Sequence, residues 1–87
     1  MGNSQMGNIE VHLFAAARSA VGHRTVTASG KTLAEVVASL IADYPAFAAV
    51  EPRCSYLVNG LAARGDLDLI NLAAGARVDV LPPFAGG

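Results

Sequence analysis

The sequence predicts an α+β domain in which one main helix packs across a mixed sheet of about five strands. Three observations predict this class. Residues 32–44 place apolar side chains at helical intervals, and short segments on either side of them have the alternation or the β-branched content of strands. Asn59-Gly60 is a strong signal for a tight hairpin. With 87 residues, of which 53% are hydrophobic, the chain is long enough for a single domain with one small core.

The N-terminal part predicts a hairpin. Residues 1–8 lack the features of a secretory signal, so we expect a short flexible leader there and the folded domain over residues 9–81. Residues 9–17 alternate as a strand, with Glu10, His12 and Phe14 on the face opposite Val11 and Leu13. Residues 18–22 are a turn or a short helix. Residues 24–28 are rich in β-branched side chains and predict a second, antiparallel strand.

The main helix has clear boundaries in the sequence. Thr32 and Glu35 have the spacing of a capping box, in which each side chain accepts a hydrogen bond from a free backbone N–H. Pro45 ends the helix because it has no N–H to donate. The apolar residues between them form one stripe that predicts a core-facing surface: Leu33, Val36, Val37, Leu40, Ile41 and Tyr44.

The second half of the chain supplies the remaining strands. Residues 46–53 are a loop or a short helical segment, residues 55–58 a third strand, and residues 61–63 a short return strand after the hairpin turn. Residues 65–75 predict a short helical turn. Residues 77–81 are the last strand, with Val78 and Val80 facing inward. The order β-β-α-β-β-β is the pattern of the ubiquitin-like β-grasp fold, which implies that the first and last strands pair in parallel.

Composition excludes several classes of function. Six basic and seven acidic residues are spread along the chain, which gives no electrostatic footprint for nucleic acid. Charged residues interrupt every apolar stretch well before the ~20 residues that a membrane-spanning helix needs. Cys54 is the only cysteine, so no internal disulfide forms, and a lone structural thiol fits the reducing cytoplasm. No histidine, cysteine or carboxylate spacing indicates a metal site, so His12 is expected to be an ordinary surface or interface residue.

The C-terminal residues 82–87 form a tail with almost no side-chain chemistry. Gly86 and Gly87 lack a Cβ, so they can lie in a channel too narrow for other residues. The reactive group that remains is the free α-carboxylate of Gly87. Because the tail follows a core strand directly, we interpret it as a carboxylate held out for activation by a partner. The alternative is a frayed end without function.

Three segments together resemble a known family. They are Val11–Arg18 followed by Val21-Gly22, the helix from Thr32, and Leu72–Gly87, which ends in Pro-Pro-Phe-Ala-Gly-Gly. On these residues the chain, from Ile9 onward, resembles the MoaD and ThiS sulfur carriers. The double proline favours the branch of the molybdopterin synthase small subunit, because ThiS-type carriers usually lack it.

The resemblance implies a mechanism and two partners. An E1-like enzyme uses ATP to adenylate the terminal carboxylate, which then becomes a thiocarboxylate. The large subunit of molybdopterin synthase binds the tail, and the sulfur passes to a pterin precursor to build the dithiolene that holds molybdenum. Gly87 would carry the sulfur, and Gly86, which has no side chain, would precede it in the narrow channel. The chain itself would bind no cofactor and would be non-catalytic alone.

Several residues are expected to contact partners. Pro82 and Pro83 restrict the backbone, so less entropy is lost when the tail and Ala85 enter a channel. Phe84 is a candidate anchor for an apolar recess, although it could instead fold back on its own sheet. An exposed apolar patch is expected beside the tail, with Arg77 as a weaker candidate for charge pairing. The patch residues would be Phe14, Leu81 and Tyr56.

Three other functions stay open at this stage. The chain could carry sulfur for thiamin, cysteine or tRNA thiolation. It could be a ubiquitin-like modifier that ends in isopeptide bonds, or a β-grasp binding module whose tail has no role. Deletion of Gly86 and Gly87 would separate the last possibility from the others, because a plain binding module would keep its affinity for its partner.

Overall fold

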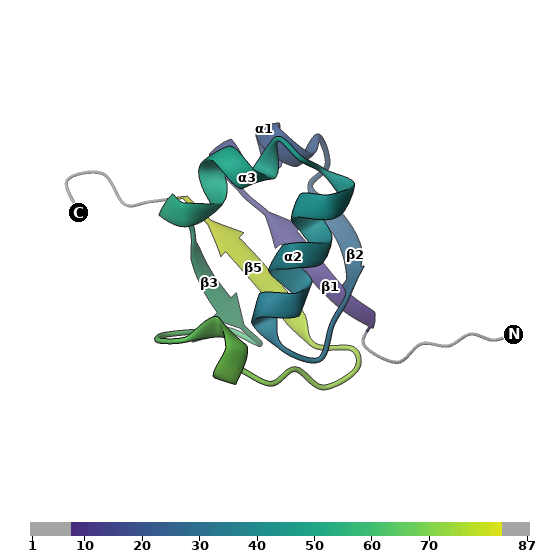
Figure 1. Cartoon of the computed structure of the whole chain (residues 1–87), viewed down its shortest axis with the longest axis vertical. Coiled ribbons are helices and arrows are strands. Elements are labelled where there is room, and N and C mark those ends of the chain that lie inside the picture. The colour runs from purple at the N-terminus through teal and green to yellow at the C-terminus, as the bar shows by residue number, and fades with distance from the viewer. Residues whose placement is uncertain (1–7, 83–87) are drawn as a thin grey trace, which may run out of the picture.

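A computed structural model of the chain describes residues 8–82. Its five strands and one long helix confirm the predicted β-grasp fold (Figure 1). The elements follow in the order β1 (Asn8–Leu13), α1 (Ala15–Val21), β2 (Thr25–Ser29), α2 (Leu33–Asp43), α3 (Phe47–Val50), the 3₁₀ turn η1 (Glu51–Arg53), β3 (Ser55–Val58), β4 (Leu61–Ala62), the 3₁₀ turn η2 (Leu67–Leu69) and β5 (Arg77–Leu81).

The sheet has the strand order β2-β1-β5-β3-β4. The first and last strands are neighbours and run parallel, with Val11 opposite Val78 and Leu13 opposite Val80. The other strand pairs are antiparallel. The parallel pairing that the fold implied is therefore confirmed, and β5 lies at the centre of the sheet with a partner on each side.

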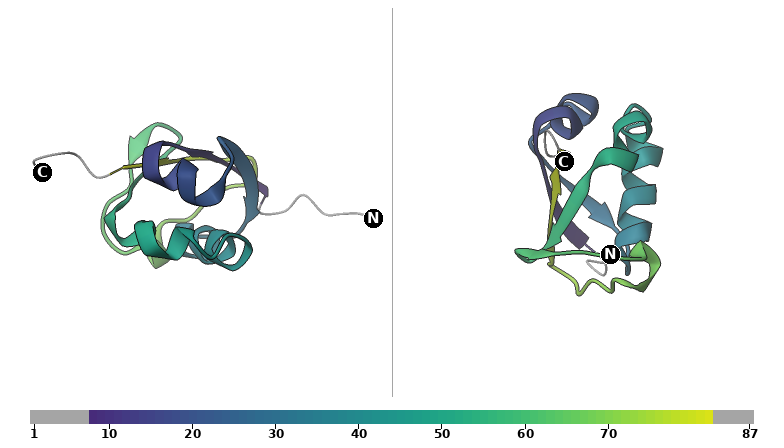
Figure 2. Two further views of the ribbon diagram at one scale, coloured as in Figure 1. Left: turned by 90° about the horizontal axis from the view of Figure 1, so that it is seen from above. Right: turned by 90° about the vertical axis from the view of Figure 1, so that its left-hand side faces the viewer.

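One face of the sheet is covered by helices (Figure 2). α2 crosses this face, and Val78 and Val80 point into the resulting core with no exposed surface. The three largest side chains without exposure are Phe47, Ile9 and Leu33, and Leu40 and Leu13 are exposed by only 1–2%. The predicted helical stripe is thus the core-facing side of α2. Within residues 8–82, no helix is long and apolar enough to cross a membrane.

The start of α2 follows the predicted capping box with one difference. Thr32 Oγ1 accepts a hydrogen bond from the Glu35 backbone N–H at 3.2 Å. The Glu35 carboxylate accepts its bond from the backbone N–H of Lys31, at 2.7 Å, and not from that of Thr32. Both bonds still satisfy free donors at the helix start, so the physical role of the motif is kept.

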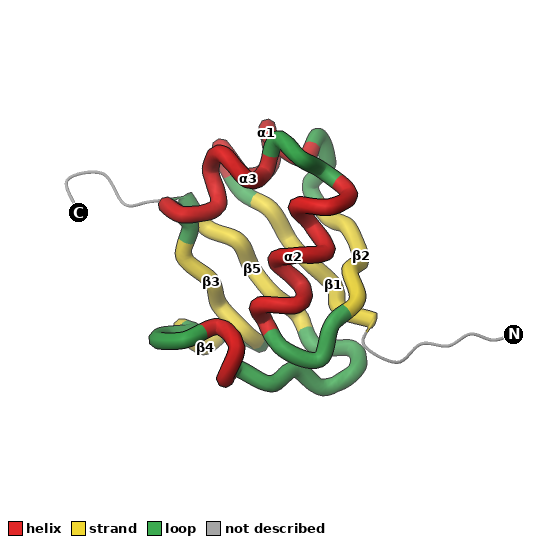
Figure 3. Tube along the Cα trace, in the orientation of Figure 1, coloured by secondary structure: helices red, strands yellow, loops and turns green. Residues whose placement is uncertain are grey.

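The hairpin at Asn59 and Gly60 is confirmed (Figure 3). Both residues have positive φ, at 50° and 86°, as the tight turn between β3 and β4 requires. Asn59 also ties the turn to the central strand. Its N–H donates to the Arg77 carbonyl at 2.8 Å, and its Oδ1 accepts from the Arg77 N–H at 2.9 Å.

The first strand is shorter than the sequence predicts. The prediction of a strand to Ala17 is wrong, because β1 ends at Leu13 and α1 begins at Ala15. Ala15 and Ala17 fit the alternation of a strand and the composition of a helix equally well, so the hydrophobic pattern does not show where the strand ends and the helix begins. Phe14 keeps an extended backbone, with φ −126° and ψ 148°, and Ala15 turns the chain with a φ of 52°. The first helix therefore starts directly beside the end of β5.

Candidate functional site

The candidate site lies at the end of β5, where the tail begins. Leu81 closes the strand and Pro82 follows it, and both side chains are half-buried. The predictions for Pro83, Phe84, Ala85, Gly86 and Gly87 lie outside the described residues. The structure therefore places the root of the tail, which we define as Leu81 and Pro82, together with the surface around it.

The root of the tail is flanked on both sides because β5 is the central strand. On the β1 side, the Phe14 N–H donates to the Val80 carbonyl at 3.2 Å, which holds Phe14 beside Leu81. On the β3 side, Ser55 is paired directly with Leu81. Phe14 leaves 40% of its surface exposed. The predicted juxtaposition of Phe14 and Leu81 is thus present in the structure, and its role in binding a partner stays a prediction.

Tyr56 does not belong to this exposed patch, contrary to the sequence interpretation. It pairs with Val80, so it shares the inward face of the sheet, and only 5% of its surface is exposed. Its hydroxyl donates to Glu51 Oε2 at 2.8 Å. Burial, and then the hydrogen bond to the Glu51 carboxylate, raise the pKa of Tyr56 far above its usual value. The residue is a structural tether between β3 and η1.

The face of the sheet that the helices leave open changes in character along the strands. Nearest the root lie Phe14, Leu81 and Ser55. One complete row then crosses all five strands: Thr25, His12, Asp79, Leu57 and Ala62. The next row is charged and polar, with Thr27, Glu10 and Arg77. The apolar side chains on this face are therefore concentrated toward the end where the tail begins.

An apolar groove runs along the β3 side of the root. It encloses about 320 Å³ and its walls come from β3, β4 and the end of β5. The lining residues are Ser55, Tyr56, Leu57, Ala62, Ala63, Arg64 and Leu81. Exposed apolar surface of this kind is typical of a binding surface.

Arg77 lies away from the root of the tail. It begins β5, four residues before Leu81, and its Nε donates to Asp79 Oδ1 at 2.8 Å. Its guanidinium is therefore already paired within the chain, although half of its side chain, 51%, remains exposed. The structure does not bring Arg77 together with the other predicted partner-binding residues, and its role stays a prediction.

Two other reactive side chains among residues 8–82, Cys54 and His12, each lie close to a polar group of their own chain. Cys54 is half-buried and its thiol donates to the Val50 carbonyl at 3.3 Å. Burial, with a smaller effect of Glu51, raises the pKa of this thiol, so the thiolate needed of a nucleophile is disfavoured. His12 Nε2 lies 3.1 Å from the Glu10 carboxylate. Across residues 8–82 no group of three or more metal-ligating side chains is assembled.

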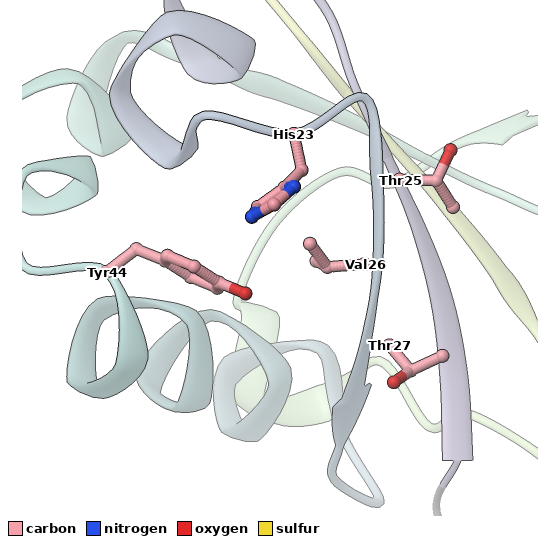
Figure 4. A pocket seen from close by; sticks show the side chains of 5 residues that line it. All are labelled: His23, Thr25, Val26, Thr27 and Tyr44. Carbon is pink, nitrogen blue, oxygen red and sulfur yellow. The ribbon is translucent and has the colours of Figure 1, made fainter.

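Two further hollows lie near the end of the sheet at which β1 ends and β2 begins. One is bordered by β2 and the end of α2, where the His23 and Tyr44 rings meet edge-to-face with centroids 6.1 Å apart (Figure 4). Val26 points toward these rings, whereas Thr25 and Thr27 point away from them (Figure 4). The other hollow is lined by Phe14, Arg18 and Arg24 among others, and Phe14 is the lining residue that lies beside the root of the tail. Sequence reasoning missed the two arginines because they belong to separate elements and form no local motif.

Comparison with known proteins agrees with this geometry. No curated protein sequence matched. The small archaeal modifier protein SAMP1 of Methanosarcina acetivorans is 28% identical, with a TM-score of 0.80 over 94% of this chain and 98% of that one. CysO of Mycobacterium tuberculosis, described as an antigen, is 27% identical, with a TM-score of 0.75 over 88% of this chain and 100% of that one.

A third similarity is confined to the fold. The complex of subunits 1 and 2 of the molybdopterin-converting factor of Helicobacter pylori contains a chain that is 20% identical, with a TM-score of 0.69 over 92% of this chain and 99% of that one. The decisive comparison is with family models, where residues 11–87 match the ThiS family. The match includes the root of the tail and the tail itself, and the chain therefore belongs to the ThiS family of ubiquitin-like sulfur carriers.

Proposed function

We propose that this chain is the sulfur-carrier small subunit of a molybdopterin synthase. The observation that carries the proposal is the position of the root of the tail: Leu81 and Pro82 end the central strand β5, and in the sequence Pro-Phe-Ala-Gly-Gly follows them. Family membership supports the sulfur-carrier role. The double proline supports the molybdopterin branch, and the Helicobacter pylori complex supplies a fold-level precedent for pairing with a second subunit.

The chemistry would be carried by the terminal carboxylate of Gly87. A carboxylate oxygen attacks the α-phosphorus of ATP in an E1-like partner, pyrophosphate leaves, and the resulting acyl-adenylate is a good electrophile. Attack of a sulfide-level sulfur nucleophile on the acyl carbon forms a C–S bond, breaks the C–O bond to AMP and gives a thiocarboxylate, a soft nucleophile that needs no activating side chain. Docking of the tail in the large subunit then positions this sulfur beside the pterin precursor, and positioning can lower a barrier by several kcal/mol.

The folded domain would serve as the surface by which both partners recognise the tail. The exposed Phe14 and the apolar groove at Leu57 and Leu81 lie on either side of the root. We infer that a partner that accepts the tail contacts both. No cofactor would be held by this chain, because ATP and the pterin would be bound by its partners. This work takes place in the cytoplasm, where a single reduced Cys54 is stable.

Intact mass spectrometry of the protein purified from its native host tests the proposal. We expect an oxygen-for-sulfur exchange that fragmentation localises to Gly87. A matched variant with one extra residue after Gly87 should fold normally and lose sulfur transfer, because its carboxylate is moved and masked. Sulfur transfer by the uncleaved extended variant would contradict the proposal.

A second candidate is a ubiquitin-like protein modifier. The observation that favours it is the similarity to SAMP1, which is higher in identity than the similarity to the molybdopterin-converting factor subunit. A modifier would form isopeptide bonds between Gly87 and target lysines, visible as adducts on denaturing gels. Carriers for thiamin, cysteine or tRNA thiolation would share the thiocarboxylate and differ only in the acceptor, which assays with the candidate acceptors distinguish.

A further inference from the structure

We propose that the hollow between β1, α1 and β2 binds carboxylate side chains of the protein that receives the tail. This inference rests on the proposed function and adds the kind of surface that the partner must present. The hollow encloses about 310 Å³ and is lined by His12, Leu13, Phe14, Arg18, Arg24 and Thr25. We call it the arginine hollow.

Two short-range constraints bring the two arginines of this hollow together. Arg18 lies in the last turn of α1, which ends at Gly22 with φ 88°, and the Gly22 N–H donates to the Arg18 carbonyl at 2.7 Å. The chain then reverses toward β2, and just before this strand the Arg24 carbonyl accepts from the Leu13 N–H at 2.8 Å. Both arginines are therefore fixed by their backbones at the end of β1, with exposed side chains.

Neither arginine is neutralised within the described part of the chain. The ion pairs there are His12 with Glu10 and Arg77 with Asp79. The guanidinium of Arg77 contacts a carboxylate at 2.8 Å, whereas those of Arg18 and Arg24 contact no carboxylate of the described residues. Two unpaired guanidinium groups around one hollow give it a local positive charge that favours an incoming anion. The planar guanidinium fork matches a carboxylate in two parallel hydrogen bonds.

The surroundings of the hollow indicate a protein carboxylate. Phe14, 40% exposed, forms one apolar wall, and the same residue is hydrogen-bonded through its N–H to Val80 at the root of the tail. A free phosphate has no apolar atoms to bury against Phe14. A protein segment can bury its own apolar atoms against Phe14 and pair its acidic side chains with the arginines. Phe14 thereby connects the hollow to the root of the tail.

The adenylation kinetics of the full-length chain with the E1-like enzyme of the same host test the inference. We expect R18E and R24E each to raise the KM for this chain about tenfold without changing kcat, because a reversed charge repels the partner. The milder double variant R18Q/R24Q should weaken the salt dependence of KM. K31E makes the same change in charge at the opposite end of the sheet, beside the start of α2, and should stay within about twofold of the wild type.

The result that overturns the inference is a KM of R18Q/R24Q equal to that of the wild type, with both proteins folded by thermal unfolding. If the wild type is not adenylated at all, the proposed function fails instead. In that case NMR titration of the full chain with the peptide acetyl-Glu-Asp-Glu-amide still decides whether the hollow binds carboxylates. Amide shifts at Phe14, Arg18 and Arg24 that are absent with the Gln-Asn-Gln peptide support it. Tighter binding of inorganic phosphate than of the acidic peptide refutes it.

Discussion

Truncation of Phe14 to alanine isolates the contribution of the surface beside the tail. The Phe14 backbone is anchored by its N–H bond to the Val80 carbonyl, at 3.2 Å, which the substitution leaves in place. The side chain is also outside the core, with 40% of its surface exposed. Phe14→Ala should therefore weaken partner binding while leaving the domain folded.

The size of the effect follows from the exposed area. If a phenylalanine side chain offers roughly 200 Å², the 40% that is exposed amounts to about 80 Å². At about 25 cal/mol per Å², full burial of this area by a partner is worth about 2 kcal/mol. A loss of about 2 kcal/mol corresponds to an increase of about 30-fold in Kd. This exceeds the threshold of about 1 kcal/mol that separates an anchor from a neutral contact.

Isothermal titration calorimetry with the E1-like enzyme measures the effect, and urea unfolding confirms that the variant is folded. Leu69→Ala is the matched control. Leu69 exposes 77% of its surface, more than Phe14, but it lies in η2 at the other end of the domain (Figure 1). Its truncation should leave Kd unchanged. An affinity of folded Phe14→Ala within twofold of the wild type would refute the reasoning, and so would an equal loss in Leu69→Ala.

Four further predictions concern single substitutions. Tyr56→Phe removes the 2.8 Å hydrogen bond to the Glu51 carboxylate, so the free energy of unfolding, measured with urea at neutral pH, should fall by about 1–3 kcal/mol. An unchanged free energy of unfolding would contradict the role of Tyr56 as a tether. The pKa of the Tyr56 hydroxyl is raised in the folded state, so above about pH 10 the hydroxyl ionises in the unfolded chain before it does so in the folded one. The free energy of unfolding of the wild type should therefore decrease as the pH rises above about 10, and it should decrease less in Tyr56→Phe. Gly30→Ala would bring a Cβ within 2.8 Å of the Val36 nitrogen and 2.9 Å of Glu35 Cβ, and should lower the free energy of unfolding by about 1–3 kcal/mol; an unchanged melting temperature would contradict it. Ala15→Gly relieves a φ of 52° and should be neutral or stabilising by up to about 1 kcal/mol, in contrast to the loss that glycine causes in an ordinary helix. Phe84→Ala should weaken partner binding by more than about 1 kcal/mol, and unchanged calorimetric affinity would exclude an anchor role.

The main helix and the hairpin could be predicted because their signals are local. The bond from Glu35 N–H to Thr32 Oγ1 needs only a spacing of three residues, and the turn at Asn59 and Gly60 needs only two residues that accept positive φ. The last strand was equally clear, since Val78 and Val80 alternate as a buried strand does. Such features depend little on the rest of the fold.

The start of α1 could not be predicted because no local signal marks it. The N-cap residue, Phe14, makes no side-chain cap bond, and the helix has no acidic residue in its first turn. Helix formation here follows from packing, since Ala17 and Val21 are buried against the rest of the core. The change from strand to helix is made by the positive φ of Ala15, a conformation that alanine seldom adopts and that its presence in a sequence does not indicate.

The position of Tyr56 depended on register, which the sequence did not provide. A shift of one residue would move it from the core to the open face, and only its pairing with Val80 decides between the two. The arginine hollow also depends on how the strands pair, which the sequence did not provide. Arg18 and Arg24 share a hollow with Phe14, and Phe14 lies beside the root of the tail because β1 and β5 are parallel neighbours and end together. Tertiary pairing, and not local pattern, assembles the surface around the tail.

The central position of β5 explains why that surface is suited to receiving a partner in one orientation. A tail that left an edge strand would have a neighbour on one side only, whereas Leu81 lies between Phe14 of the β1 side and Ser55 of β3. The two flanks differ in chemistry, because the arginine hollow adjoins Phe14 and the apolar groove adjoins Ser55. Under the proposed function, a partner that matches both flanks would approach in a single direction, so the terminal carboxylate would reach its reaction site already aligned. This alignment would be the contribution of the folded domain to the chemistry of its last residue.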